Sequence, residues 1–496
     1  MERQICFLHF TFLNKMTWNF EDLVVKAVSH GEKLGATYVE ARYHSISRSG
    51  LSARNGEIIG AEKSFSQGIA VRVIVDGSLG FASTSSLTQE DVLATVEKAY
   101  KKAKSHSKLQ KKPIVFSEER LGRVTYEATA KVKPEDVDFQ EKSNYHKELW
   151  KNVSTAISQA KVATMTSFYG ESLEEKIIVN TDGAYIKSRI PRLSLGYNVV
   201  VSLPSKGVIQ RFFSHAASGG YELINQWNVH GYLPEDVKTF EKILLEATKP
   251  PVDTPVDVVV GSEIVGLMVH ESCGHPSEAD RILGREAAQA GKSFIKPNML
   301  GERIGSEYAT VIDDPTIPGS NGFYLYDDEG VPARPRYLCK NGIINEFLHN
   351  RWTASIFNTH SNAAARAMSH EGEPIVRMAN TYFAPGDHTF EELIEDIKFG
   401  VYIKSYMEWN IDDERWSQRY GGLEAYLIEN GELKGLVRNP VLELTTKTFY
   451  SNVDAADKNL AFYAGTCGKG EPMQGVPVWF GGPNVRVRNI KLRVIG

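Results

Sequence analysis

The chain has 496 residues, which is too long for one ordinary hydrophobic core, so two domains are expected. Its composition, 42% hydrophobic and 24% charged, is normal for a globular protein, and no apolar run reaches the roughly 18 residues that span a bilayer. A net charge of −4 argues against a protein that binds nucleic acid by neutralising phosphates.

The cysteine content and the N-terminal stretch bear on the cellular location. Four unevenly spaced cysteines do not form a disulfide framework, so we expect a cytoplasmic protein without membrane association. Residues 6–13 are apolar, but His9 interrupts them and no small-residue cleavage site follows, which is unlike a signal peptide. Met16 is an alternative start, because the helical pattern begins just after it.

The first half of the chain is predicted to mix helices with hairpins. Hydrophobic periodicity predicts helices over residues 20–34, 89–103 and 139–161, the second capped by Thr88. Asn55-Gly56 and Asp76-Gly77 are typical of tight hairpin turns. The predicted strands cover residues 38–45, 51–54, 57–61, 68–75, 78–83, 163–169, 175–180, 184–190 and 192–201.

The second half is richer in predicted strands. Asn341-Gly342 and Asn430-Gly431 are again hairpin signals, and residues 390–399 are predicted to form a helix capped by Asp387. The Pro250-Pro251 pair lies in the best candidate boundary, residues 238–255. We therefore predict an α+β fold with an N-terminal domain over residues 17–237. The second domain, residues 238–496, is predicted to be a large, mostly antiparallel sheet domain that carries a helix-borne metal site.

One short stretch places two imidazoles and a carboxylate within six residues, HESCGH at positions 270–275. Neutral imidazole is a good zinc ligand, and a carboxylate beside the metal can accept a proton from an attacking water. Five residues apart, His270 and His275 would be separated on an ideal helix by roughly 140° and about 7.5 Å. Gly274 relaxes the backbone and Pro276 disfavours a helical His275, so we predict that the helix breaks at Gly274 and His275 turns back toward the metal.

The residues before this motif predict a rigid support. The apolar, β-branched residues 256–260 indicate a buried strand, and Ser262 can cap the following helix, whose apolar residues would face the core. Two histidines and a glutamate also occur together by chance in long proteins with no metal. The hexapeptide alone does not exclude such a chance occurrence without a metal.

A catalytic zinc normally takes three protein ligands, so a third ligand must come from elsewhere in the chain. Cys467 is the best candidate, because it lies in a glycine-rich stretch with Lys469 nearby to lower the thiol pKa. The alternative is a buried free thiol, which fits Cys6 and Cys339 well. Cys273 would project from another side of the helix and is predicted to be a packing residue. Weaker candidates for the third ligand are His349, His360 and His370.

Several separate blocks of the sequence together resemble one known family. They are GIAVRV (68–73), HESCGHPSEAD (270–280), YDDEG (326–330), RMANT (377–381) and TCGK (466–469). This combination is similar to the TldD/PmbA family of peptidases, historically called modulators of DNA gyrase. That family has one kind of subunit with the six-residue motif and one without it, so the chain resembles the TldD-type, catalytic subunit. Cys273 and Pro276-Ser277 depart from the residues expected there, which bears on specificity and not on the chemistry.

The motif and the resemblance together predict a zinc-dependent peptidase. His270, His275 and Cys467 are expected to hold zinc, and Glu271 to act as the general base that later protonates the leaving amine. The resemblance implies cleavage of unfolded peptides or small, loosely folded proteins in a cavity enclosed by two subunits. The second subunit would be an identical chain or a relative that lacks the motif.

Other interpretations concern the surroundings of the site and the class of protein. Glu278 and Asp280 are candidate acceptors for the free ring nitrogen of a ligand histidine, the alternative being surface charge. A non-catalytic scaffold with a structural metal site would need a fourth ligand, either Glu271 or Cys273. A nucleic-acid-linked regulator, which the gyrase name suggests, conflicts with the acidic net charge.

Overall fold

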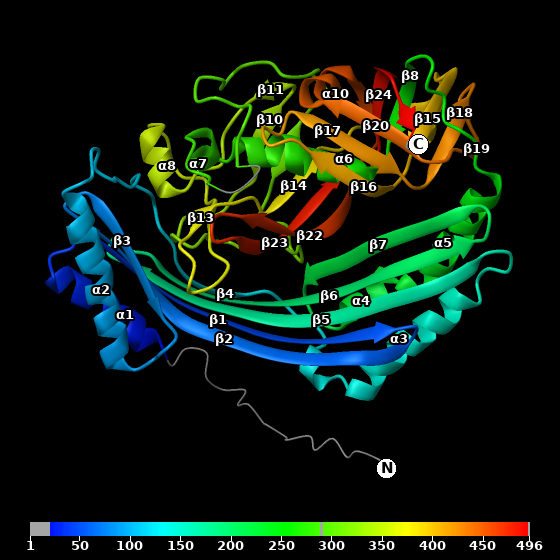
Figure 1. Cartoon of the computed structure of the whole chain (residues 1–496). Helices are drawn as coiled ribbons and strands as arrows, with labels where there is room; N and C mark the ends of the chain where they lie inside the picture. Colours follow the sequence, from blue (N-terminus) through cyan, green and yellow to red (C-terminus); the bar gives the residue numbers. More distant parts are fainter. Residues whose placement is uncertain (1–19, 288–290, 495–496) are drawn as a thin grey trace, which may run out of the picture.

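The computed structural model describes residues 20–287 and 291–494, so the expectations for Cys6, His9 and Met16 lie outside the described residues. A long curved sheet from the first half of the chain lies beneath a strand-rich part from the second half (Figure 1). The predicted α+β class is confirmed. The division at residues 237 and 238 stays a prediction.

The N-terminal sheet has the order β3-β2-β1-β5-β6-β4, with β7 also paired to β6. Adjacent strands of this sheet are antiparallel, except that β4 and β6 are parallel. The longest strand has 20 residues, which corresponds to about 65 Å. The strands are β1 (Tyr38–Arg54), β2 (Glu57–Val75), β3 (Ser78–Thr84), β4 (Arg123–Glu127), β5 (Lys161–Asn180), β6 (Tyr185–Leu203) and β7 (Gly207–Ser218).

Several strands that were predicted as separate are continuous in the structure. Residues 38–45 and 51–54 both belong to β1, and residues 57–61 and 68–75 both belong to β2. The polar residues 47–50 resemble a loop in the sequence, but each is paired with β2 on one side and β5 on the other. Full pairing satisfies their backbone groups. Both turns were predicted correctly, since Asn55, Gly56, Asp76 and Gly77 all have positive φ angles.

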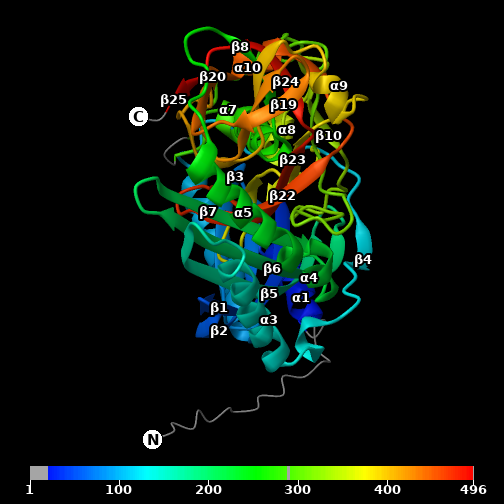
Figure 2. The same ribbon diagram turned by 90° about the vertical axis from the view of Figure 1, so that its right-hand side faces the viewer.

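Helices cover the two ends of the sheet's outer face (Figures 1 and 2). Thr88 caps its helix as predicted, accepting a hydrogen bond from the Asp91 N–H at 3.2 Å. The helix predicted over residues 139–161 ends early, because the chain enters β5 at Lys161. The helices are α1 (Glu21–Lys33) and α2 (Gln89–Ser107) at one end and α3 (Phe139–Ser154), α4 (Glu222–Trp227) and α5 (Val229–Glu246) at the other, with a short 3₁₀ turn at Pro134–Asp136.

The second half forms several sheets and not the one large sheet that we expected. Their orders are β11-β10-β9-β14-β23-β22, β19-β18-β15-β8-β24-β21 and β16-β17-β20-β25, and β12 pairs with β13. Most neighbours are antiparallel, as predicted; β14 with β23 and β15 with β8 are parallel. The strands are β8 (Val256–Val260), β9 (Val311–Asp313), β10 (Arg336–Lys340), β11 (Ile343–Ile344), β12 (Ala365–Arg366), β13 (Ile375–Val376), β14 (Asn380–Phe383), β15 (Phe399–Ile403), β16 (Tyr406–Ile411), β17 (Ser417–Gly422), β18 (Ala425–Glu429), β19 (Glu432–Leu436), β20 (Pro440–Thr445), β21 (Val453–Ala456), β22 (Ala461–Lys469), β23 (Gln474–Gly482), β24 (Val485–Ile490) and β25 (Arg493–Val494).

The helices of this half are short, and α6 is the one that leads into the HESCGH motif. The helix predicted over residues 390–399 ends at Ile394, and its cap is Thr389 and not Asp387, because Thr389 and Glu392 form a capping box. The predicted turns at Asn341-Gly342 and Asn430-Gly431 are present. The helices are α6 (Ser262–Val269), α7 (Ala279–Ile282), α8 (Arg351–Ile356), α9 (Phe390–Ile394) and α10 (Thr446–Asn452).

A buried ion pair joins the two halves at this helix. Arg211 of β7 donates two hydrogen bonds to the Glu263 carboxylate of α6, at 2.8 and 2.9 Å. Both side chains are buried, so each charge depends on the other for compensation. The N-terminal sheet is therefore attached directly to the helix that carries the motif. Among the described helices, none is both long and apolar enough to cross a membrane.

Candidate metal centre

The support for the motif is a strand followed by a fully buried helix. β8 covers residues 256–260, as predicted, and every residue of α6 from Glu263 to Val269 is buried. The predicted cap is wrong: Gly261 occupies the N-cap position, and no side chain caps the helix. Ser262 instead shares a hydrogen bond with the Tyr463 hydroxyl at 2.6 Å. That contact attaches the start of α6 to β22.

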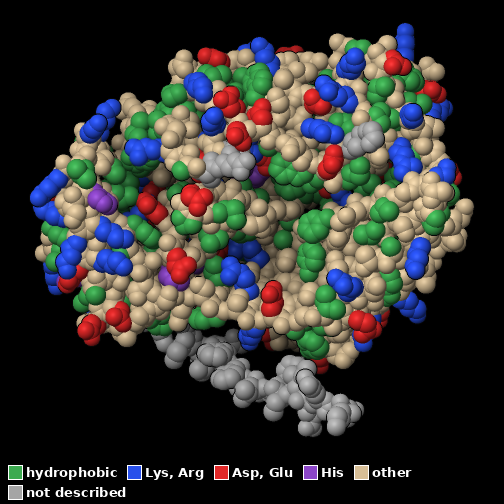
Figure 3. Space-filling view, viewed as in Figure 1, with side chains coloured by type: hydrophobic (Ala, Val, Ile, Leu, Met, Phe, Trp, Pro, Cys, Tyr) green, Lys and Arg blue, Asp and Glu red, His purple; other side chains and the backbone are tan. Residues whose placement is uncertain are grey.

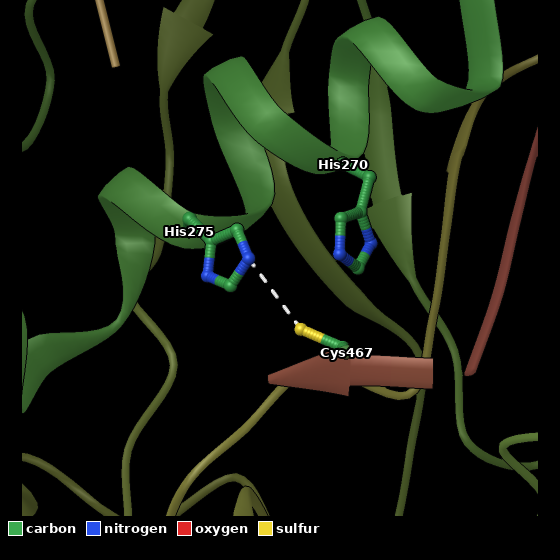
Figure 4. Close-up of side chains that lie close together, drawn as sticks. All are labelled: His270, His275 and Cys467. Atoms are coloured by element: carbon green, nitrogen blue, oxygen red, sulfur yellow. Dashed lines mark hydrogen bonds between the residues drawn. The ribbon is translucent and has the colours of Figure 1, made fainter. Parts of the chain in front are cut away.

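The helix widens into a π-helical turn over His270–Gly274 and does not break there. The His275 N–H donates to the His270 carbonyl, five residues back. This wider turn brings residues five apart onto one face, and the two imidazole centroids lie 5.1 Å apart. The predicted break at Gly274 is wrong. His275 stays helical, at φ −59° and ψ −45° (Figure 4). Pro276 follows in the first turn of a 3₁₀ helix, a position where the missing N–H of proline costs no helical hydrogen bond.

Two glycines allow close packing around this helix. A Cβ at Gly274 would lie 2.0 Å from the Met378 sulfur, so this glycine serves packing and not a break in the helix. A Cβ at Gly266 would lie 2.6 Å from the backbone nitrogen of Gly481 in β23. The absence of a side chain therefore lets α6 lie directly on the strand next to β22.

His270, His275 and Cys467 come together as predicted. One ligand atom from each lies within 4.8 Å of the others, and all three side chains are buried (Figure 4). Cys467 lies on β22, and not in a loop, with its sulfur 3.4 Å from His275 Nε2. Two imidazole nitrogens and a thiol form a donor set that suits zinc, with the three protein ligands typical of a catalytic site. The residues therefore fit the predicted metal.

The surroundings of Cys467 favour its thiolate form. Burial opposes ionisation, but His275 and Arg377 outweigh it and lower the pKa of the Cys467 thiol to about 7. The sequence pointed to Lys469 as the neighbouring positive charge. Lys469 lies on the same face of β22 as Cys467, but its ammonium group bonds Asp280 and the Val376 carbonyl, and the pKa of the thiol is lowered by His275 and Arg377.

A buried carboxylate orients His275. Glu278 Oε2 lies 3.0 Å from His275 Nδ1, which leaves Nε2 directed at Cys467. Burial raises the pKa of Glu278, but Lys469, His275 and Arg281 hold it well below its usual range. Asp280, the other candidate, bonds Lys469 at 2.6 Å and no histidine. Within the described residues, Nδ1 of His270 is buried without a hydrogen-bond partner.

Glu271 is buried next to this cluster and forms an ion pair with Arg415. Arg415 lies 144 residues further along the chain, between β16 and β17. Sequence reasoning missed it, because neither its spacing nor its neighbours resemble a catalytic motif. The contact between Arg415 and Glu271 becomes visible only in the folded structure.

The remaining cysteines and histidines have other surroundings. Cys273 and Cys339 are buried in the hydrophobic core, as expected. His349 bonds the Thr353 hydroxyl at 3.2 Å, His370 bonds the Ser85 hydroxyl at 3.1 Å, and His360 is exposed beside Glu119. In the described part of the chain, none of these three histidines joins the cluster.

Family comparisons agree with this geometry. The chain matches the PmbA/TldA metallopeptidase domain 1 over residues 39–103, the central domain over residues 132–248, and the C-terminal domain over residues 253–493. A metalloprotease of Methanocaldococcus jannaschii is 33% identical over 451 residues, which cover 90% of this chain and 95% of the relative. The chain belongs to the PmbA/TldD metallopeptidase family. The expectation of a metallopeptidase is thereby confirmed.

Other relatives extend the comparison within the family. A zinc metalloprotease TldD homolog of Saccharolobus solfataricus is 26% identical over 94% of this chain and 99% of its own. A proposed modulator of a DNA gyrase from Thermotoga maritima shares the fold with a TM-score of 0.74, at 18% identity, covering 96% of this chain and 100% of its own. TldE from Thermococcus kodakarensis has a TM-score of 0.69, at 20% identity, over 95% and 99% of the two chains. The family fold extends over nearly the whole chain.

We predict that Gly266→Ala destabilises the protein by about 1–3 kcal/mol, because the new methyl group would meet the backbone of Gly481 and neither element can move freely. Chemical denaturation measures the change. Gly435→Ala is the matched control, because a Cβ there would have no atom within 4 Å. Equal stability of the Gly266 variant and the wild type would contradict this packing argument.

Proposed function

We propose that this chain is a zinc-dependent peptidase of the TldD type, with zinc held by His270, His275 and Cys467 and with Glu271 as the general base. The observation that carries the proposal is the buried cluster of two imidazoles and a low-pKa thiol beside a buried carboxylate. The name of the Saccharolobus relative, a zinc metalloprotease, supports the choice of metal.

The chemistry divides between the metal and the side chains. Zinc bound at these donors would polarise the scissile carbonyl and acidify the attacking water. Glu271 accepts the proton of that water and later delivers it to the leaving amine. Glu278 holds the His275 ring so that Nε2 faces Cys467. The three proposed ligands and Glu271 are all buried, which keeps competing bulk water away.

A non-catalytic scaffold with a structural metal is the second candidate. A structural zinc is normally closed by four protein ligands. Within the described residues the cluster offers three, since Cys273 lies in the core and Glu271 is paired with Arg415. An incomplete protein ligand set supports the catalytic interpretation.

The substrate we propose is an extended peptide that pairs with β22. This strand lies at the end of its sheet, so one edge has no strand partner among the described residues. It carries Cys467, so a peptide paired with that edge would lie beside the cluster. Figure 3 shows the molecule hollowed between its upper and lower parts. Backbone pairing demands little of the side chains, which favours broad selectivity.

We further propose that the working enzyme is a dimer, with either an identical chain or a motif-lacking relative enclosing the site. The likeness to TldE, itself a solved member of this fold, supports such a partner. A nucleic-acid partner is not proposed, because the net charge is −4.

We expect Cys467→Ala to lose most of its zinc, because the remaining two histidines cannot hold a catalytic ion firmly. Elemental analysis of the purified protein measures the metal content. Cys273→Ala is the matched control, since its thiol is buried in the core, and it should keep stoichiometric zinc. Full zinc in the Cys467 variant would assign the third ligand to another residue.

Glu271→Gln should keep its zinc and its fold while peptide hydrolysis falls by at least about 100-fold, because an amide cannot accept the proton. The test combines elemental analysis, thermal unfolding and a peptide cleavage assay. Loss of zinc in this variant would make Glu271 a ligand, and unchanged hydrolysis would exclude it as the base.

Short unstructured peptides should be degraded, while a compact, stable protein survives under the same conditions, because a folded domain cannot present an extended strand to β22. Mass spectrometry of digests measures both. The matched control is the same stable protein after denaturation and alkylation, which should become a substrate. Rapid cutting of surface loops in the folded form would refute an enclosed site.

A further inference from the structure

Arg415 contacts Glu271 directly. Its Nη1 forms an ion pair with Glu271 Oε2, and both side chains are buried. The contact is made through one of the two carboxylate oxygens of Glu271. The guanidinium therefore fixes the carboxylate through Oε2.

The turn that carries Arg415 is held rigidly. The Arg415 N–H donates to the Asp412 carbonyl at 3.1 Å, and the Thr446 hydroxyl donates to the Arg415 carbonyl at 2.8 Å. The Asp412 carboxylate also accepts the N–H groups of Trp416 and Ser417, each at 2.8 Å. These contacts fix the backbone of the turn before any substrate arrives.

The backbone of Arg415 is strained. Its φ is 65°, in the left-handed region that an arginine rarely adopts. Arginine has no short polar group to favour this conformation locally, so the surrounding hydrogen bonds must maintain it. Strain of this kind persists where it serves a site, and here it directs a buried guanidinium at the proposed base.

We propose that Arg415 is a positioning residue that orients the Glu271 carboxylate for proton transfer. This inference rests on the proposed function, in which Glu271 is the general base. A glutamate side chain has several rotatable bonds, and a misplacement of about 1 Å can cost roughly 100-fold in rate. The fixed guanidinium removes that freedom, while zinc binding does not depend on it.

The test is a double-mutant cycle on the full-length, zinc-loaded protein with an unstructured peptide as substrate. The variants are Arg415→Gln, Glu271→Gln and the double variant, with Arg415→Lys as the conservative change. Arg419→Gln is the matched control, because Arg419 is half-exposed on the adjoining β17. The measurements are kcat, KM, zinc content and the midpoint of thermal unfolding.

We expect Arg415→Gln to lower kcat by about 100-fold, with KM within about two-fold and zinc unchanged, because only the orientation of the base is lost. Arg415→Lys should recover part of kcat, and Arg419→Gln should match the wild type. In the Glu271→Gln background, Arg415→Gln should cause no further loss, because its effect passes through the glutamate.

Two results would overturn the inference. An equal loss from Arg415→Gln in both backgrounds would mean that Arg415 acts on the substrate independently of Glu271. Wild-type kcat in a folded Arg415→Gln protein would remove any role. If Arg415→Gln fails to fold, Arg415→Lys provides the test. A stable Arg415→Lys variant with wild-type kcat would likewise contradict the inference. Full activity of Glu271→Gln would instead reject the proposed function itself.

Discussion

The hydrogen bond from the His275 N–H to the His270 carbonyl sets the spacing on which the candidate metal centre depends. A regular α-helix would separate two residues five apart by roughly 140°. The wider turn brings both rings to one face, 5.1 Å apart, without interrupting the helix. The rings can then share a partner that approaches from one side, and β22 supplies it in Cys467.

Close packing of three separate segments explains why this turn is stable. Gly266 lets α6 lie on β23, and Gly274 admits Met378 against the π-helical turn. Burial on this scale excludes water from every polar group nearby, so each charge needs a partner. The Glu278 carboxylate pairs with His275, Arg281 and Lys469. Arg415 forms an ion pair with Glu271. The same contacts therefore both pack the helix and orient the side chains of the site.

Local signals in the sequence predicted much of this arrangement. The hairpin turns at Asn-Gly and Asp-Gly follow from backbone preference alone, and β8, α6 and the two histidines follow from a strand and helix beside a metal-type motif. Cys467 came from its glycine-rich surroundings and the family resemblance. These features depend on few neighbours in space, which is why the sequence could reveal them.

Other features depend on contacts between distant residues and could not be predicted. The polar middle of β1 resembles a loop until β2 and β5 pair with it on both sides. In the sequence, Gly274 and Pro276 resemble the end of a helix. In the structure, Gly274 makes room for the Met378 side chain, and the chain continues through a π-helical turn. Arg415 has no local signature, because its ion pair with Glu271 forms only when its turn meets the π-helical turn in the folded chain.

The N-terminal sheet contributes no donor to the described cluster, yet the site depends on it. Arg211 compensates the charge of Glu263 on α6, about two turns before the motif begins. Loss of the Arg211 side chain alone would leave that carboxylate buried and unpaired, which is costly enough to disturb the helix. The sheet also forms the lower part of the molecule, below the hollow in Figure 3. The candidate metal centre is carried by the second half of the chain, and the first half holds the helix that leads into it through the Arg211–Glu263 pair.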